Sequence, residues 1–249
     1  MKSKFIFGRD EETQNLHARL VKKRPFLVHG PAGAGKTLLL RNLLCEFPDM
    51  VYCENAATTQ VIFRTVARAL LQRDNARVLK AVHDEVGIKM KSAVSLKGIV
   101  MDALHTGKYC IVLDHLKRPS YSLASAVREI MGWAATPVVA VARSPHMEDV
   151  GFLQPFYSDK SEKYEIRNFE PAIAEQFVQE IVRRNGLFAN NMRDFLEKVL
   201  EFSHGNPGAI LAMMEMAGYP KYRSEENIKI TPLYIDFRMN WGQAGSPRK

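Results

Sequence analysis

Eight residues near the N-terminus combine glycines, a lysine and a threonine in the order that phosphate binding requires. The segment Gly30-Pro-Ala-Gly-Ala-Gly-Lys-Thr37 matches the pattern GxxxxGK[ST] in full. Glycines let the backbone turn its N–H groups inward as an anion-binding nest, and a helix that begins there adds its positive end. The Lys36 ammonium would reach the β- and γ-phosphates, and the Thr37 hydroxyl would bind Mg²⁺. We therefore expect the following residues to bind a nucleotide: Gly30, Pro31, Ala32, Gly33, Ala34, Gly35, Lys36, Thr37 and Leu38.

A carboxylate further along the chain supplies the second part of such a site. The apolar run 109–113 is typical of a buried strand and ends in Asp114, which would hold Mg²⁺ directly or through water. Many ATPases with this loop place a second carboxylate next, where it orients or deprotonates the attacking water. Here that residue is His115. A neutral imidazole accepts a proton, so His115 is a candidate weak general base. The alternative is that His115 takes no part in the chemistry and that turnover is slow.

Short apolar runs alternate with helical periodicity over the first two thirds of the chain. The runs that predict strands are 25–29, 50–53, 109–113, 137–142 and 162–167. Helical spacing of apolar residues covers 9–21, 37–44, 61–70, 96–104 and 123–133. Strands that alternate with helical crossovers predict an α/β fold, with a mainly parallel sheet covered by helices on both faces.

The pattern changes after about residue 168. Three helices are predicted over 171–184, 191–202 and 207–217, with no strand between them. We therefore expect an α/β nucleotide-binding domain over residues 1–168 and a small helical domain over 169–218. Residues 219–249 are left unassigned, and the apolar segments 228–231 and 233–237 are either a pair of strands or an ordered tail.

Three further motifs resemble those of the STAND and origin-recognition-like branches of the AAA+ ATPases. Phe7-Gly8-Arg9-Asp-Glu-Glu12 is similar to the FxGRxxE box, which in that family lies beside the adenine. The run 138–142 ends in Arg143, as does the sensor 1 strand of STAND proteins, whose arginine senses the γ-phosphate. Gly205-Asn-Pro207 resembles the GxP motif, whose proline packs near the adenine. With the phosphate-binding loop, these motifs follow the family order over residues 5–217.

The resemblance implies a sheet order of 5-1-4-3-2, a helical lid that closes over ATP, and ATP or ADP with Mg²⁺ as cofactors. It implies that Arg143 senses the γ-phosphate and that Phe7, Gly8, Arg9 and Pro207 contact the nucleotide. With the residues derived above, the predicted catalytic residues are Lys36, Asp114, His115 and Arg143, and the predicted metal ligands are Thr37 and Asp114. ATP hydrolysis would be weak because His115 replaces the second acid. Simpler roles stay open: Arg9 as a surface arginine paired with Glu12, and Arg143 as a solvated charge at a strand end.

Composition restricts the class of protein and its partners. Hydrophobic residues make up 46% of the chain and charged residues 25%, which excludes a disordered or fibrous protein. No stretch approaches the roughly 20 apolar residues of a membrane span, and no apolar signal region follows Met1, so we expect no membrane partner and a cytoplasmic location. The net charge of +8 favours polyanionic partners.

Two functions therefore compete. The first is a nucleotide-dependent molecular switch that hydrolyses ATP slowly and is completed by a protein partner or by a second copy, with Arg118 or Arg128 as a candidate arginine finger. The second is a DNA-associated helper ATPase of the transposition or replication type, favoured by the net charge and by the basic cluster 22–24. A phosphotransferase would need acids and bases for a second substrate, and the sequence offers no such set.

Overall fold

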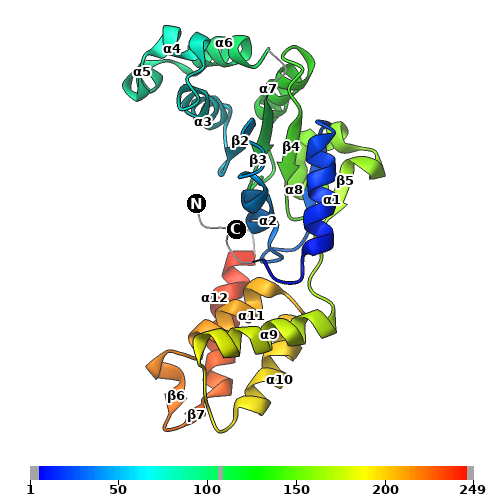
Figure 1. Ribbon diagram of the computed structural model, residues 1–249, viewed down its shortest axis with the longest axis vertical. Helices are drawn as coiled ribbons and strands as arrows, with labels where there is room; N and C mark the ends of the chain where they lie inside the picture. The colour runs from blue at the N-terminus through cyan, green and yellow to red at the C-terminus, as the bar shows by residue number, and fades with distance from the viewer. Residues whose placement is uncertain (1–5, 106–108, 246–249) are drawn as a thin grey trace. The chain divides into compact units, whose positions relative to one another are not determined.

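The structure is a computed structural model that describes residues 6–105 and 109–245 (Figure 1). Contacts divide the chain into two compact units, and each is described by itself. The sheet unit comprises Glu11–Gly30 and Lys36–Glu165. The helical unit comprises residues 6–10, Pro31–Gly35 and 166–245. The phosphate-binding loop, residues 30–37, thus contributes residues to both units, a division that the sequence gives no means to anticipate.

The sheet unit is built on five parallel strands, labelled in Figure 1. They are β1 (Phe26–His29), β2 (Met50–Cys53), β3 (Cys110–Leu113), β4 (Val138–Val141) and β5 (Lys163–Glu165). Their order is β2-β3-β4-β1-β5, which confirms the order 5-1-4-3-2 and the α/β fold class. Because parallel strands are buried on both faces, they appear in the sequence as short, almost uninterrupted apolar runs.

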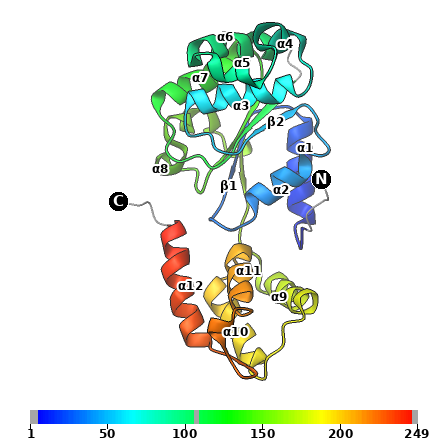
Figure 2. The same ribbon diagram turned by 90° about the vertical axis from the view of Figure 1, so that its left-hand side faces the viewer.

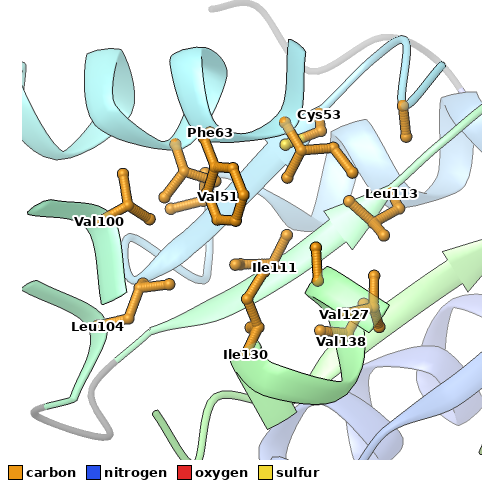
Figure 3. Close-up of a cluster of buried hydrophobic side chains, with 14 of the residues drawn as sticks. Val51, Cys53, Phe63, Val100, Leu104, Ile111, Leu113, Val127, Ile130 and Val138 are labelled. Atoms are coloured by element: carbon orange, nitrogen blue, oxygen red, sulfur yellow. The ribbon is translucent and has the colours of Figure 1, made fainter. Parts of the chain in front are cut away.

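The sheet's two faces are set by the alternation of side chains along each strand. On β2 and β3, Val51, Cys53, Ile111 and Leu113 belong to the main buried cluster. Helices α3 (Thr59–Leu71), α6 (Ala93–Leu104) and α7 (Tyr121–Gly132) contribute to the same cluster (Figure 3). The residues between them, Tyr52 and Val112, alternate to the opposite face, and so does Asp114, two positions beyond Val112. The strand pattern therefore assigns Tyr52 and Asp114 to the same face of the sheet.

Helices connect these strands. They are α1 (Asp10–Val21), α2 (Lys36–Leu43), α3 (Thr59–Leu71), α4 (Ala76–Val82), α5 (Glu85–Met90), α6 (Ala93–Leu104), α7 (Tyr121–Gly132) and α8 (Met147–Val150), with 3₁₀ turns η1 (Gly151–Tyr157) and η2 (Lys160–Glu162). Three of them, α4, α5 and α8, are additions to the expected pattern, and each is at most seven residues long. Helices α4 and α5 are each defined by a capping side chain, Asn75 and Asp84 respectively, rather than by a long apolar period.

The helical unit packs α9 (Pro171–Asn185), α10 (Met192–Ser203) and α11 (Pro207–Met216) around its own buried cluster (Figure 2). Pro171 and Pro207 each stand at the first position of their helix, where the missing N–H costs nothing. The 3₁₀ turn η3 (Pro220–Tyr222), the two-residue strands β6 (Arg223–Ser224) and β7 (Asn227–Ile228), and α12 (Ile230–Gly245) follow.

The pair of strands considered for residues 228–237 is wrong. Only Ile228 lies in a strand, and residues from Ile230 onward form α12. Leu233 and Phe237 are four residues apart and both buried, a spacing that places them on one side of a helix. The unassigned residues 246–249 lie outside the described residues. Within the described ranges, no helix is long and apolar enough to cross a membrane.

Candidate functional site

The backbone of the phosphate-binding loop adopts conformations that favour glycine. Gly30, Gly33 and Gly35 have φ angles of 147°, 81° and 97°, a region in which a side chain is strained. A side chain added at Gly35 would meet no atom within 4 Å, so the backbone angle alone demands glycine there. Helix α2 starts at Lys36 and includes the half-buried Leu38. The loop thus joins glycine conformations to a helix N-terminus, the arrangement that binds phosphate.

The ammonium of Lys36 is partly buried beside this loop. It donates a hydrogen bond to the carbonyl oxygen of Gly30 at 2.7 Å. Burial lowers the pKa of Lys36 to about 8; attraction to Asp114 opposes the shift, and repulsion from Arg143 adds to it. Desolvation disfavours a charged amine, whereas a nearby anion favours it. A phosphate group would therefore supply the negative charge that this ammonium needs to stay protonated.

Asp114 lies directly after β3 and is 1% exposed. Its Oδ2 accepts a hydrogen bond from the Thr37 hydroxyl at 2.7 Å, and its Oδ1 accepts one from the backbone N–H of His115 at 2.6 Å. The start of α2 and the end of β3 thus bring a hydroxyl and a carboxylate together. The sequence placed these two residues at one metal site, and the structure has them in contact.

The donor set at this point fits Mg²⁺ bound together with a nucleotide. In the part of the chain that the structure describes, no group of three or more His, Cys, Asp and Glu residues could hold a metal alone. Mg²⁺ commonly takes one or two protein oxygens and completes its octahedral shell with water and substrate phosphates. Thr37 and Asp114 supply such oxygens, so they are the residues that would hold Mg²⁺ here.

Tyr52 is a residue of this site that the sequence analysis missed. Its hydroxyl, projecting from β2, donates a hydrogen bond to Oδ2 of Asp114. Burial and the contact with Asp114 both raise the pKa of Tyr52, so the phenol keeps its proton and acts as a donor. The only signal in the sequence is strand alternation, which sets Tyr52 on the same face as Asp114 once the register of β2 and β3 is known.

His115 contributes to the site through its backbone N–H, which donates to Asp114, more clearly than through its ring. The residue has φ of 55°, and its imidazole is 56% exposed, with Nε2 3.9 Å from Oδ2 of Asp114. The backbone N–H helps to orient the aspartate, while the ring faces solvent and is accessible to a water molecule. Its role as a general base stays a prediction.

Arg143 follows β4 and lies close to the loop. Its carbonyl oxygen accepts a hydrogen bond from the N–H of Gly30 at 3.1 Å, and its half-buried guanidinium is close enough to Lys36 to lower the pKa of that lysine. Two cations near one anion-binding loop suit a polyphosphate better than a single carboxylate. The candidate arginine fingers Arg118 and Arg128 are both exposed.

Arg9 braces the loop within the helical unit. Its guanidinium donates to the carbonyl oxygens of Ala34, at 3.2 Å, and Arg167, at 2.6 Å. It also stacks over the ring of Phe169, 4.4 Å from the centroid. Because Arg9 is 6% exposed, the alternative of a surface arginine is wrong. Arg9 was expected beside the adenine. The structure shows in addition that it hydrogen-bonds to the backbone of the phosphate-binding loop.

The residues before Arg9 anchor this segment to α9. The ring of Phe7 lies 5.3 Å from that of Phe177. Gly8 has φ of 59°, and a side chain there would approach Ile173 Cγ2 to 2.7 Å. The aromatic contact and the close approach of the glycine explain why the motif needs these two residue types. Contacts of Phe7, Gly8 and Arg9 with adenine stay predictions.

The start of α11 holds the other side of the same loop segment. The side-chain amide of Asn206 donates to the carbonyl oxygen of Ala32 at 2.8 Å, and the N–H of Gly208 donates to that of Gly33 at 3.0 Å. A side chain at Gly33 would collide with Asn206 Oδ1 and would touch Trp241 of α12. The sequence analysis selected Pro207, which is buried at the first position of α11. The hydrogen bonds to the loop are made by its neighbours Asn206 and Gly208.

Comparison with known proteins decides the family. The model of the AAA ATPase domain matches residues 6–141, which is more than half of the 249-residue chain. The chain belongs to the AAA ATPase domain family. This AAA ATPase is therefore a nucleotide-dependent enzyme of the AAA+ class, as its motifs predicted. No match was found among curated protein sequences.

Solved structures share the fold of this AAA ATPase at low sequence identity. The Walker-type ATPase PABY2304 of Pyrococcus abyssi is 16% identical with a TM-score of 0.62, covering 98% of this chain and 77% of its own. The Orc1 protein of Aeropyrum pernix, solved in complex with DNA, is 17% identical with a TM-score of 0.65, covering 95% and 66%. A STAND protein of Pyrococcus horikoshii with a tetratricopeptide repeat sensor is 12% identical with a TM-score of 0.51, covering 95% and 32%. The AAA ATPase thus spans about two thirds of the Orc1 chain and one third of the STAND chain.

Proposed function

We propose that this AAA ATPase binds ATP at residues 30–37 with Mg²⁺ held by Thr37 and Asp114, hydrolyses it slowly, and works as a nucleotide-dependent molecular switch. The observation that carries the proposal is the 2.7 Å hydrogen bond between Thr37 and Asp114. It joins the phosphate-binding helix to the end of β3 and gathers two oxygen ligands. Mg²⁺ held by these two residues would neutralise charge that develops on the phosphates.

The chain's own residues account for the remaining steps. The loop N–H groups and the Lys36 ammonium bind the phosphates, and Arg143 adds a positive charge beside Lys36. Asp114 is held by three donors, so it enters the reaction already oriented. No carboxylate follows it, and the exposed ring of His115 is left to activate the water, which supports slow turnover.

A switch also needs a route from the nucleotide to another part of the protein. The loop segment Pro31–Gly35 is held on one side by Arg9 and on the other by the start of α11. Phosphate binding requires the loop N–H groups to take fixed directions, and within the helical unit the same loop segment is bonded to Arg9 and to the start of α11. We infer that nucleotide state is read out through these bonds.

The alternative is a DNA-associated helper ATPase. It is favoured by the likeness to an Orc1 protein solved with DNA, by the net charge of +8, and by the exposed side chains of Lys22, Lys23 and Arg24. In that case assembly on DNA would be the output, and affinity would fall steeply as salt is raised.

The deciding experiment measures steady-state phosphate release from ATP with and without double-stranded DNA, at low and moderate salt. The switch predicts slow release that DNA leaves unchanged and that Lys36→Ala abolishes. Stimulation of several-fold by DNA, lost when Lys22, Lys23 and Arg24 are all changed to alanine, would favour the helper ATPase. Release that Lys36→Ala leaves unchanged would exclude both functions.

A further inference from the structure

The carboxylate of Asp114 accepts hydrogen bonds from three donors in three different parts of the sheet unit. Thr37 belongs to α2, His115 follows β3, and Tyr52 belongs to β2. Only the first is expected from the phosphate-binding motif. The tyrosine comes from a neighbouring strand, and its phenol shares the single oxygen Oδ2 with the Thr37 hydroxyl.

This shared oxygen fixes the aspartate more tightly than either donor could alone. A carboxylate held by one hydrogen bond can still turn about its Cβ–Cγ bond, because aspartate's terminal torsion is broad. Thr37 on Oδ2 and His115 on Oδ1 limit that torsion, and Tyr52, as a second donor to Oδ2, restricts it further and narrows the direction of the lone pairs that remain. Mg²⁺ demands nearly ideal octahedral geometry, so it is sensitive to such directions.

Tyr52 itself is held in place. Its strand neighbours Val51 and Cys53 are fully buried on the other face of β2. The guanidinium of Arg41, from α2, lies 5.4 Å from the centre of the Tyr52 ring and pairs with Glu54 at 2.5 Å. The half-buried ring therefore lies beside the guanidinium of Arg41 on α2, with its hydroxyl directed at Asp114.

We propose that Tyr52 is a positioning residue that orients Asp114 for the metal bound with the nucleotide. The inference rests on the proposed function and deepens it, because it assigns a second donor to the metal-binding carboxylate. Partners that hydrogen-bond a metal ligand typically contribute about 10- to 100-fold in metal affinity. Tyr52→Phe keeps the ring and removes only the donor, so it isolates this effect.

The test uses Mn²⁺ as the metal probe. Mn²⁺ is titrated into protein saturated with ADP, and free Mn²⁺ is measured by electron paramagnetic resonance for wild type and Tyr52→Phe. ADP affinity without metal is measured in parallel with a fluorescent ADP analogue. Tyr157→Phe is the matched control, because its hydroxyl donates to the carbonyl oxygen of Val138 within the same unit, away from Asp114.

Tyr52→Phe is expected to weaken Mn²⁺ binding about 10-fold and to change metal-free ADP affinity less than twofold, with Tyr157→Phe matching wild type in both. Metal affinity equal to wild type in Tyr52→Phe overturns the inference, and so does a parallel loss of ADP and metal affinity. If wild type itself binds neither ADP nor Mn²⁺, the proposed function fails instead, so the two failures are distinguishable.

Discussion

The side-chain amide of Asn206 donates a hydrogen bond to the carbonyl oxygen of Ala32, across 174 positions of sequence. The same side chain caps α11 through its Oδ1, which accepts from the N–H of Ala209 at 3.0 Å. Asn206 therefore caps the N-terminus of α11 and also hydrogen-bonds to the phosphate-binding loop. Its two functions use different atoms, so they can be separated by substitution.

Asn206→Asp separates them. Aspartate keeps the oxygen that caps α11 but replaces the amide, which donates to Ala32 and also to Oδ1 of Asn168, with a second oxygen that repels both acceptors. We expect nucleotide affinity to fall about 10-fold, since breaking a buried hydrogen bond of this kind costs about 1–3 kcal/mol. Thr58→Ala is the control, because the Thr58 side chain caps α3 by accepting from the N–H of Val61. It should reduce stability by about 1 kcal/mol and leave the affinity unchanged. Equal nucleotide affinity in Asn206→Asp and wild type would contradict the role of this contact.

His115→Glu tests why turnover is slow. A carboxylate at this position would supply the base that the exposed imidazole replaces, and a positioned general base typically contributes at least about 100-fold. We expect phosphate release at saturating ATP to rise at least about 10-fold with unchanged ADP affinity. His115→Gln, which has no base, is the matched variant and should not exceed wild type. If the glutamate variant is no faster than wild type, a missing carboxylate is not what limits the rate.

Arg143→Ala tests the recognition of the terminal phosphate. Because this guanidinium adds to the positive charge around Lys36, its loss should lower the affinity for ATP about 10-fold, as expected for one charge-assisted contact. The affinity for ADP should change less than twofold. Arg128→Ala removes an exposed arginine on α7 and serves as the control. Equal losses for ATP and ADP would assign Arg143 to the general positive field instead of to the γ-phosphate.

Nucleotide binding should take up protons above pH 8. Burial lowers the pKa of Lys36 to about 8, so at pH 8.5 most nucleotide-free protein carries the neutral amine. Bound phosphates favour the ammonium and raise its pKa, so nucleotide binding takes up part of a proton at this pH, and nucleotide affinity falls as pH rises through 8. Calorimetry at pH 8.5 in two buffers of different ionisation enthalpy measures the uptake. Lys36→Arg, whose guanidinium stays charged, should abolish the proton uptake. A wild-type binding enthalpy that does not depend on the buffer would contradict the prediction.

The parts of this molecule that follow from local pattern were predictable. Buried parallel strands appear as short apolar runs, and the residues GKT after a strand mark the start of α2. Asp114 follows from its place at the end of β3. The sheet order came from family resemblance, since strand order depends on packing between distant segments.

The remaining residues of the site depend on contacts distant in sequence. Tyr52 acts only because β2 and β3 are neighbours, with Cys53 beside Leu113. Asn206 bonds to Ala32, and Trp241 lies where a side chain at Gly33 would meet it. In the sequence alone, these two residues are explained by simpler roles, as a helix cap and as part of an amphipathic helix. Helix α12 was missed because its apolar residues also fit the alternation of a strand.

The most direct test is equilibrium binding of a fluorescent ATP analogue with and without Mg²⁺, for wild type, Lys36→Ala and Asp114→Asn. One site made by Lys36, Thr37 and Asp114 predicts that Mg²⁺ tightens binding to wild type, that Lys36→Ala weakens it in both conditions, and that Asp114→Asn loses only the gain from Mg²⁺. Unchanged Mg²⁺-dependent binding in both variants would contradict this assignment, because the nucleotide would then be held elsewhere.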